Sequence, residues 1–245
     1  LAAYTSALHR PLGVDRIAVT SSGVSALMLA TQMLVGQGDE VVAVVPVWPN
    51  LTAQPAILGA NVKRVPLVPR DGAWTLDLQA LLDAVTPATR MLLVNAPNNP
   101  TGWTLTRAEQ QAIIEHCRRT GTWIVADEVY ERLWFGEGAT VAGPPQDGRA
   151  PLRGAQAEGE LGAHSSAPSF LDIAEPEDRL IVVHSFSKSF LMTGWRLGWM
   201  VLPNGHLDAI GKLIEFNTSC APVFVHRAGL AGLQTAKTTV PALAQ

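Results

Sequence analysis

The sequence predicts an α/β fold in three layers, with a mostly parallel central sheet flanked by helices on both faces. Short apolar segments alternate with helical segments along most of the 245 residues. Several of the apolar segments are nearly continuous, which is typical of strands buried on both faces of a parallel sheet. Apolar residues make up 47% of the chain and charged residues 16%, so one large domain can bury a substantial core.

The first half of the chain alternates regularly between the two kinds of segment. Residues 1–9 have the pattern of the end of an amphipathic helix, and a helix over 23–35 ends near two glycines. Strands are predicted at 16–20, 40–45, 62–67 and 90–95 from their runs of apolar residues. The strand at 62–67 is expected to close in a turn at 69–72, where Pro, Asp and Gly gather, and 76–85 is predicted helical.

The second half continues the alternation. Thr106 and Glu109 form a capping-box pattern, which starts a helix over 107–119. Strands follow at 122–126, 180–184 and 195–201, and helices at 206–216 and 223–234. Between them, residues 136–169 are rich in Gly, Ala, Pro and Ser, which predicts a long surface loop or insertion.

Charge and cysteine content exclude several classes of protein. A net charge of −3 gives no electrostatic basis for binding nucleic acid or an anionic membrane. The most apolar region, 180–202, is interrupted by charged residues and does not predict a membrane span. Cys117 and Cys220 lie far apart and form no metal-binding pair, so we expect no metal site, reduced thiols and a cytoplasmic protein without a signal peptide.

One lysine lies among small hydroxyl residues just after the strand predicted at 180–184. Lys188 follows Ser185 and Ser187, and Arg196 comes eight residues later. This pattern suits an amine that forms a Schiff base, with serines and an arginine holding a phosphate nearby. A lysine in a solvated loop is the alternative, and this segment alone leaves both possibilities open.

Two further segments follow predicted strands at the sheet edge where ligands bind in such folds. Ser22, Gly23 and Val24 open a helix, and backbone N–H groups at a helix N-terminus can bind phosphate. Trp48 follows the strand at 40–45, and its indole can stack on a flat ring. An ordinary capped turn and a core tryptophan are the alternatives.

Polar residues follow the next two strands. Asn99 lies between two prolines and can donate an amide hydrogen bond to a ring oxygen. Asp127 ends an apolar strand, where a buried carboxylate needs a partner such as a pyridinium nitrogen, and Tyr130 can reach the ring oxygen. A turn before a helix and an N-cap aspartate are the alternatives. Taken together, the five segments match the groups of pyridoxal phosphate, which is the predicted cofactor.

The sequence resembles the fold-type I aminotransferases of classes I and II, the aspartate aminotransferase superfamily. The resemblance extends over about residues 1–235 and rests on the motifs at 46–50, 98–102, 127–130 and 185–188, with Arg196. It implies that Lys188 forms the Schiff base and moves the proton, and that Asp127 pairs with the ring nitrogen. It also implies that the ring is held by Asn99, Tyr130 and Trp48, and the phosphate by Ser22, Gly23, Val24, Ser185, Ser187 and Arg196.

The resemblance further implies a function and an assembly. An amino group would move between an L-amino acid and a 2-oxo acid by a ping-pong mechanism, in a homodimer with residues near 217–222 facing the partner's site. The chain is shorter than the family's full-length members, so we expect a fragment, the large domain without the N-terminal arm and the C-terminal small domain. No residue of this sequence is assigned to the substrate α-carboxylate.

Four alternative functions remain open at this point. A C–S lyase or another fold-type I enzyme uses the same lysine chemistry. A regulatory domain that binds the cofactor without catalysis shares the fold. The third alternative is a fragment that binds the cofactor but needs further segments to react, and the fourth is an unrelated phosphate-binding α/β protein, which needs neither Lys188 nor Asp127.

Overall fold

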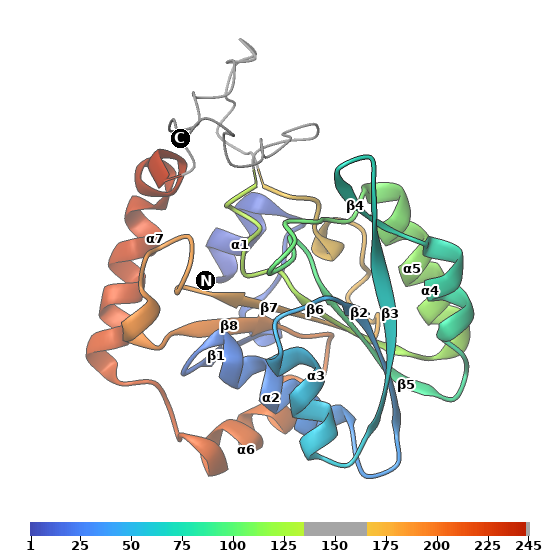
Figure 1. Ribbon diagram of the computed structural model, residues 1–245. Coiled ribbons are helices and arrows are strands. Elements are labelled where there is room, and N and C mark those ends of the chain that lie inside the picture. The colour runs from blue at the N-terminus through green and yellow to red at the C-terminus, as the bar shows by residue number, and fades with distance from the viewer. Residues whose placement is uncertain (135–165, 244–245) are drawn as a thin grey trace.

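The central sheet confirms the predicted α/β class. The computed structural model describes residues 1–134 and 166–243 (Figure 1). Within these residues the sheet has eight strands in the order β1-β8-β7-β6-β5-β2-β3-β4. Their bounds are β1 (Ile17–Thr20), β2 (Glu40–Val45), β3 (Asn61–Arg70), β4 (Ala73–Leu76), β5 (Thr89–Asn95), β6 (Trp123–Asp127), β7 (Leu180–Ser185) and β8 (Gly198–Val201).

The interior of the sheet is parallel. Strands β3, β2, β5, β6 and β7 pair in parallel, whereas β8 runs antiparallel to both β7 and β1, and β4 runs antiparallel to β3. All residues of β6 and of β7 are buried, which explains their continuous apolar sequences. The carboxyl ends of β1, β2, β5, β6 and β7 therefore meet at one edge of the sheet.

Helices cover both faces, which gives the three layers seen in Figure 1. One face packs against α1 (Ala2–Leu8), α4 (Leu78–Ala84), α5 (Arg107–Thr120) and α7 (Val223–Leu243). The other face packs against α2 (Gly23–Leu34), α3 (Asn50–Ile57) and α6 (Leu207–Asn217). Helix α5 begins with the predicted capping box, in which Thr106 accepts from the Glu109 amide and the Glu109 carboxylate accepts from the Thr106 amide.

Several predicted elements differ from the structure in the segment of α3, β3 and β4, the last two of which form one edge of the sheet. Helix α3 was not predicted, because Pro49 precedes it, Pro55 lies in it and its apolar pattern is weak. Strand β3 continues to Arg70 through the residues expected to form a turn, and the turn consists of Asp71 and Gly72, both with positive φ. The chain then returns as β4, whose residues were expected to be irregular or helical.

Two further differences lie near the C-terminal part. The strand predicted over 195–201 begins only at Gly198, because Thr193–Trp195 form a 3-10 turn and Arg196 has a left-handed backbone with φ of 57°. Helix α7 continues to Leu243 rather than ending near 234. Threonine has a low helix propensity, but the hydroxyls of Thr235 and Thr239 donate hydrogen bonds to helix carbonyls three or four residues earlier.

Of the surface loop predicted at 136–169, residues 136–165 lie outside the described residues, and only 166–169 are described. Its described end is held against the strand-end region, where the Ala167 N–H donates to the Glu131 carbonyl at 2.8 Å. Ser169 Oγ donates to the Glu128 carboxylate at 2.5 Å. In the described part of the chain, no helix combines the length and apolarity needed to cross a membrane.

Candidate active site

A cavity of about 230 Å³ opens at the edge of the sheet where the five strand ends meet. The turn before α2 follows β1, and the segments of Trp48 and Asn99 follow β2 and β5. Asp127 is the last residue of β6, and Lys188 comes three residues after the end of β7. Topology alone thus brings together segments that are more than 150 residues apart in the chain.

One end of the cavity is lined by the first turn of α2 and by the segment after β7. Gly23 and Val24 line the wall, and the first N–H groups of a helix have no acceptor within the helix. Ser187 N–H donates to Ser185 Oγ at 3.1 Å, which fixes the turn that precedes the lysine. Arg196 reaches the same wall, and its Nη1 donates to the Thr193 carbonyl at 2.7 Å. Unpaired N–H groups, hydroxyls and a guanidinium together suit an anion such as phosphate.

The backbone packing beneath this end requires glycine at one position. A Cβ atom on Gly198, the first residue of β8, would lie 2.6 Å from the Gly23 nitrogen and 2.6 Å from the Ser22 carbonyl carbon. Only glycine allows β8 to approach the start of α2 this closely. The antiparallel strand β8 therefore supports the turn that presents N–H groups to the cavity.

Asp127 lies on the inner wall of the cavity and is almost fully buried, with 2% of its surface exposed. Among the described residues, one hydrogen-bond donor reaches its carboxylate, the Val129 N–H at 3.3 Å. Burial raises the pKa of Asp127 to about 7, although that hydrogen bond and the charge of Lys188 act in the opposite direction. A cationic N–H donor placed in the cavity would complete the pairing of this carboxylate.

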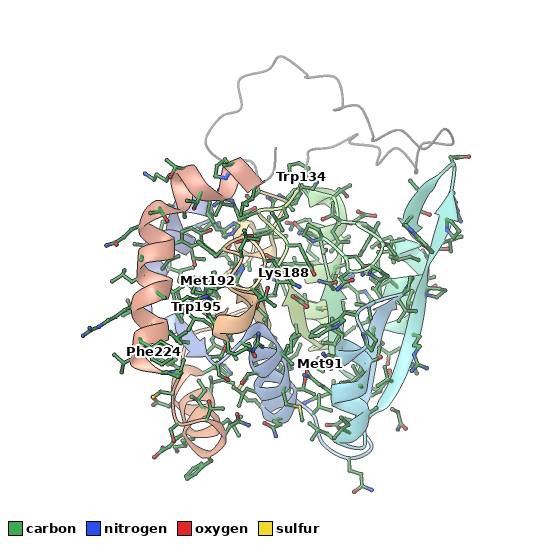
Figure 2. The ribbon with its side chains drawn as sticks, turned by 60° about the vertical axis from the view of Figure 1, so that its left-hand side comes forward. Met91, Trp134, Lys188, Met192, Trp195 and Phe224 are labelled. Atoms are coloured by element: carbon green, nitrogen blue, oxygen red, sulfur yellow. The ribbon has the colours of Figure 1, made fainter. Side chains whose placement is uncertain are left out.

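The remaining wall carries the amine, the phenol and the aromatic rings. Lys188 Nζ lies 5.4 Å from the centre of the Tyr130 ring. Asn99 Nδ2 donates to the Tyr130 hydroxyl at 3.5 Å, so an amide and a phenol meet at one point of the wall. Trp48 is partly buried and lines the cavity as well. In Figure 2, Lys188 lies near the centre of the view, with Met192 and Trp195 on the side toward α7.

The cavity contains all but one of the residues predicted from the sequence. Ser22 is buried and does not line the wall, since its Oγ caps α2 by accepting from the Ser25 N–H at 3.0 Å. Four lining residues were not predicted: Leu27, Asn95, Val129 and Thr193. Val129 lies within the motif at 127–130, and Asn95 and Thr193 lie within three residues of Asn98 and Arg196, so their proximity in sequence was the available signal. Leu27, one turn after Gly23 on α2, had no such signal because its apolar character predicts core.

A group of largely buried charged side chains holds the end of α1 against the rest of the fold. The His9 ring is hydrogen-bonded to Asp172 at 2.7 Å and to Glu131 at 3.1 Å. Burial by itself lowers the pKa of His9, but these two carboxylates raise it to about 10. Glu131 also lies 3.5 Å from His184. These contacts give His9, Asp172 and Glu131 a structural role in holding α1.

Comparisons with known proteins give a consistent assignment. Residues 2–245 match the family model described as aminotransferase class I and II. The chain is 34% identical over 219 residues to an aspartate aminotransferase of Musicola paradisiaca, a match covering 89% of this chain and 47% of that protein. It is 29% identical over 223 residues to the arginine–pyruvate transaminase AruH of Pseudomonas aeruginosa, covering 90% of this chain and 49% of that protein.

Solved structures show the same likeness. A double mutant of Thermus thermophilus aspartate aminotransferase aligns with a TM-score of 0.81 at 26% identity, over 100% of this chain and 56% of that one. A PLP-dependent aminotransferase from Streptococcus suis aligns with a TM-score of 0.75 at 26% identity, over 97% of this chain and 54% of that one. This chain thus spans about half the length of the curated relatives it matches. It belongs to the class I and II aminotransferases, a family whose cofactor is pyridoxal phosphate.

Proposed function

We propose that this chain forms the cofactor-binding large domain of an aminotransferase that moves an amino group between an L-amino acid and a 2-oxo acid. The observation that carries this proposal is the one cavity lined by Lys188, Asp127 and Arg196, which come from the end of β6 and from the connection between β7 and β8. An amine, a buried carboxylate and a guanidinium are the groups that recognise the aldehyde, the ring nitrogen and the phosphate of pyridoxal phosphate. Family membership supports the same reaction class.

The residues at the anion end would hold the phosphate. Gly23 and Val24 offer backbone N–H groups at the positive end of the α2 dipole. Ser185, Ser187 and Arg196 supply hydroxyls and a charged fork that can bind two phosphate oxygens. Ser22 would offer its backbone N–H as well, and its side chain fixes the turn by capping α2.

The inner wall would hold the ring. The Asp127 carboxylate fits the ring nitrogen because it is buried and its one described donor leaves it short of a partner. Asn99 and Tyr130 together would hold the ring oxygen, and Trp48 would cover one face of the ring. When bound, pyridoxal phosphate supplies an aldehyde that captures amines and a ring that takes up an electron pair.

The chain's own contribution to the chemistry rests on Lys188 and Asp127. Lys188 Nζ, displaced by the amino group of the substrate, would take the substrate's α-proton as a general base and return it as a general acid. Asp127 would stay ionised beside a cationic ring nitrogen, because the added positive charge lowers its pKa. A 2-oxo acid entering second would reverse these proton transfers, which gives ping-pong kinetics.

We further propose a homodimer that binds neither nucleic acid nor membrane, and a cytoplasmic location. Cys117 and Cys220 are both free thiols, which agrees with a reducing compartment. The net charge of −3 offers no electrostatic basis for binding nucleic acid or an anionic membrane.

Borohydride trapping tests the proposed cofactor lysine. Pyridoxal phosphate added to the purified chain should give a visible absorption band, and reduction should attach the cofactor to Lys188, as peptide mass spectrometry would show. Lys188→Ala should lose both the band and all transamination of L-amino acids. Arg118→Ala, a substitution in the exposed ion pair with Asp178, is the matched control and should keep both. Turnover in Lys188→Ala, or attachment of the cofactor at another lysine, would contradict the assignment of Lys188 as the cofactor lysine.

A further inference from the structure

Asn95 is a buried polar residue at the edge of the cavity, where β5 and β6 end side by side. It ends β5, only 1% of its surface is exposed, and its side chain lines the cavity. In the parallel pairing of β5 and β6, Asn95 lies opposite Asp127. The strand register thus places an amide beside the residue proposed to bind the ring nitrogen.

Both ends of the Asn95 amide are used in hydrogen bonds to the backbone. Its Nδ2 donates to the Asp127 carbonyl at 2.9 Å. Its Oδ1 accepts from the Asn99 N–H at 2.7 Å. One side chain therefore connects the residue proposed for the ring nitrogen to the residue proposed for the ring oxygen.

This connection is specific to an amide. Leucine would fill the same volume but would leave the Asn99 N–H without this acceptor at a partly buried position. Aspartate could accept from Asn99 but could not donate to the Asp127 carbonyl, and it would add a second negative charge next to Asp127. Asparagine has the donor and the acceptor together, in a planar group with few rotamers.

We propose that Asn95 is a positioning residue that fixes the spacing between Asp127 and Asn99, so that both contacts to the cofactor ring form together. The proposal rests on the function proposed above. The effect of removing Asn95 should be local, because no described hydrogen bond joins Asn95 to Gly23 or Arg196 at the anion end. Loss of the bridge should change the electronic state of the bound ring and leave the anion end unchanged.

The test compares Asn95→Ala with a control in the same segment. Asn98→Ala is matched, because Asn98 is also buried and its Oδ1 holds the Thr101 N–H and hydroxyl, but it bonds to neither Asp127 nor the Asn99 N–H. The first readout is the pKa of the cofactor's visible band after pyridoxal phosphate is bound. The second is the rate of the half-reaction with an L-amino acid, and the third is the affinity for inorganic phosphate.

Asn95→Ala is expected to shift the pKa of the visible band and to slow the half-reaction by roughly ten- to a hundredfold, the size of effect that a misplacement of about 1 Å produces. Phosphate affinity should stay within about twofold of wild type, since the α2 turn is intact. Asn98→Ala should keep the wild-type pKa of the band. Asn95→Asp, which preserves volume and one of the two bonds, serves if Asn95→Ala does not fold, and it should shift the pKa as well.

Two results would overturn the inference. One is a wild-type band pKa and half-reaction rate in both Asn95 variants. The other is an equal shift in Asn98→Ala, which would mean that any loosening of the segment has the same effect. Hydrogen exchange at the Asn99 amide without cofactor adds an independent check, because it should accelerate in Asn95→Ala and an unchanged rate contradicts the bridge. A wild-type chain that forms no reducible band is the separate failure of the proposed function.

Discussion

At the scale of single residues, the Asp127 carboxylate connects cofactor binding to stability. Its pKa is raised by burial from 3.8 to about 7, so the unfolded chain loses this proton before the folded chain does. The free energy of unfolding therefore falls as pH rises from about 4 to about 7, by at most about 4 kcal/mol from this group. The residue that suits a pyridinium partner thus destabilises the protein without one.

We predict that Asp127→Asn stabilises the cofactor-free protein at pH 8 and weakens both cofactor binding and turnover. The gain in the free energy of unfolding should shrink at pH 5, where the folded wild type is largely protonated at this position. Urea denaturation at the two pH values, without cofactor, measures the difference. Asp71→Asn, at an exposed turn, is the control and should change little. A variant that is less stable than wild type at pH 8 would contradict this account of Asp127.

Among the residues that line the cavity, the charged ones were the easiest to predict from the sequence. Lys188 and Asp127 stand out because a charged residue at or just after the end of an apolar strand needs a partner, and Arg196 stands out by its spacing from Lys188. Asn95 ends the strand predicted just before the motif at 98–102, yet its role depends on the register between β5 and β6, which only the folded sheet provides. Ser22 illustrates an ambiguity that the sequence left open, since its side chain caps α2 by accepting from the Ser25 N–H.

At the scale of elements, helix α1 is too short to be stable alone and depends on its contacts with the rest of the fold. Tyr4 packs between Phe190 and Trp199, with ring centres 5.9 and 6.2 Å away, and its hydroxyl accepts from Arg132 at 3.2 Å. His9, just after the helix, is held between Glu131 and Asp172. The ion pairs of His9 thus fix the end of α1 against the strand-end region.

We predict that His9→Gln destabilises the protein, most strongly at neutral and acidic pH. The folded-state pKa of about 10 lies above the ordinary 6.5, so the protonated ring stabilises the fold fully below about pH 6.5 and loses this effect as pH rises through 10. A shift of this size corresponds to at most about 5 kcal/mol. Denaturation of wild type and variant at pH 6 and pH 10 measures it, with His226→Gln at an exposed position as the control. An equal loss at both pH values would mean that packing, not charge, holds the helix.

The elements themselves were predictable where apolar pattern and capping agree. Helix α5 has both, and it begins where the capping box predicts. Helix α3 has no clear apolar stripe and contains a proline. It forms because Leu51 packs into the core beside α2. Strand β4 forms because β3 continues past its prolines and provides a pairing edge, which is a tertiary effect that local pattern does not contain.

At the scale of the whole molecule, exposed apolar side chains lie where α6 ends and α7 begins. Phe216 is 84% exposed, and Val223 and Phe224 are each 67% exposed. Figure 2 shows Phe224 on the outer side of α7. Exposed large apolar side chains such as these are typical of an interface with another polypeptide. The proposed homodimer provides such a partner, and this junction includes the region 217–222 expected from the sequence to face it.

We predict that the chain runs in solution at twice its 26.1 kDa mass and that Phe224→Asp reduces it to the single mass. A charge placed in a buried apolar interface has no partner, so the dimer loses stability while the fold of each chain does not depend on this exposed side chain. Light scattering after size exclusion measures the mass, and circular dichroism checks the fold. Trp74→Asp, at an exposed site on β4 at the far end of the sheet, is the matched control and should remain a dimer. A single-mass wild type would contradict the homodimer for this chain. A variant Phe224→Asp that keeps the double mass would instead place the interface elsewhere on the surface.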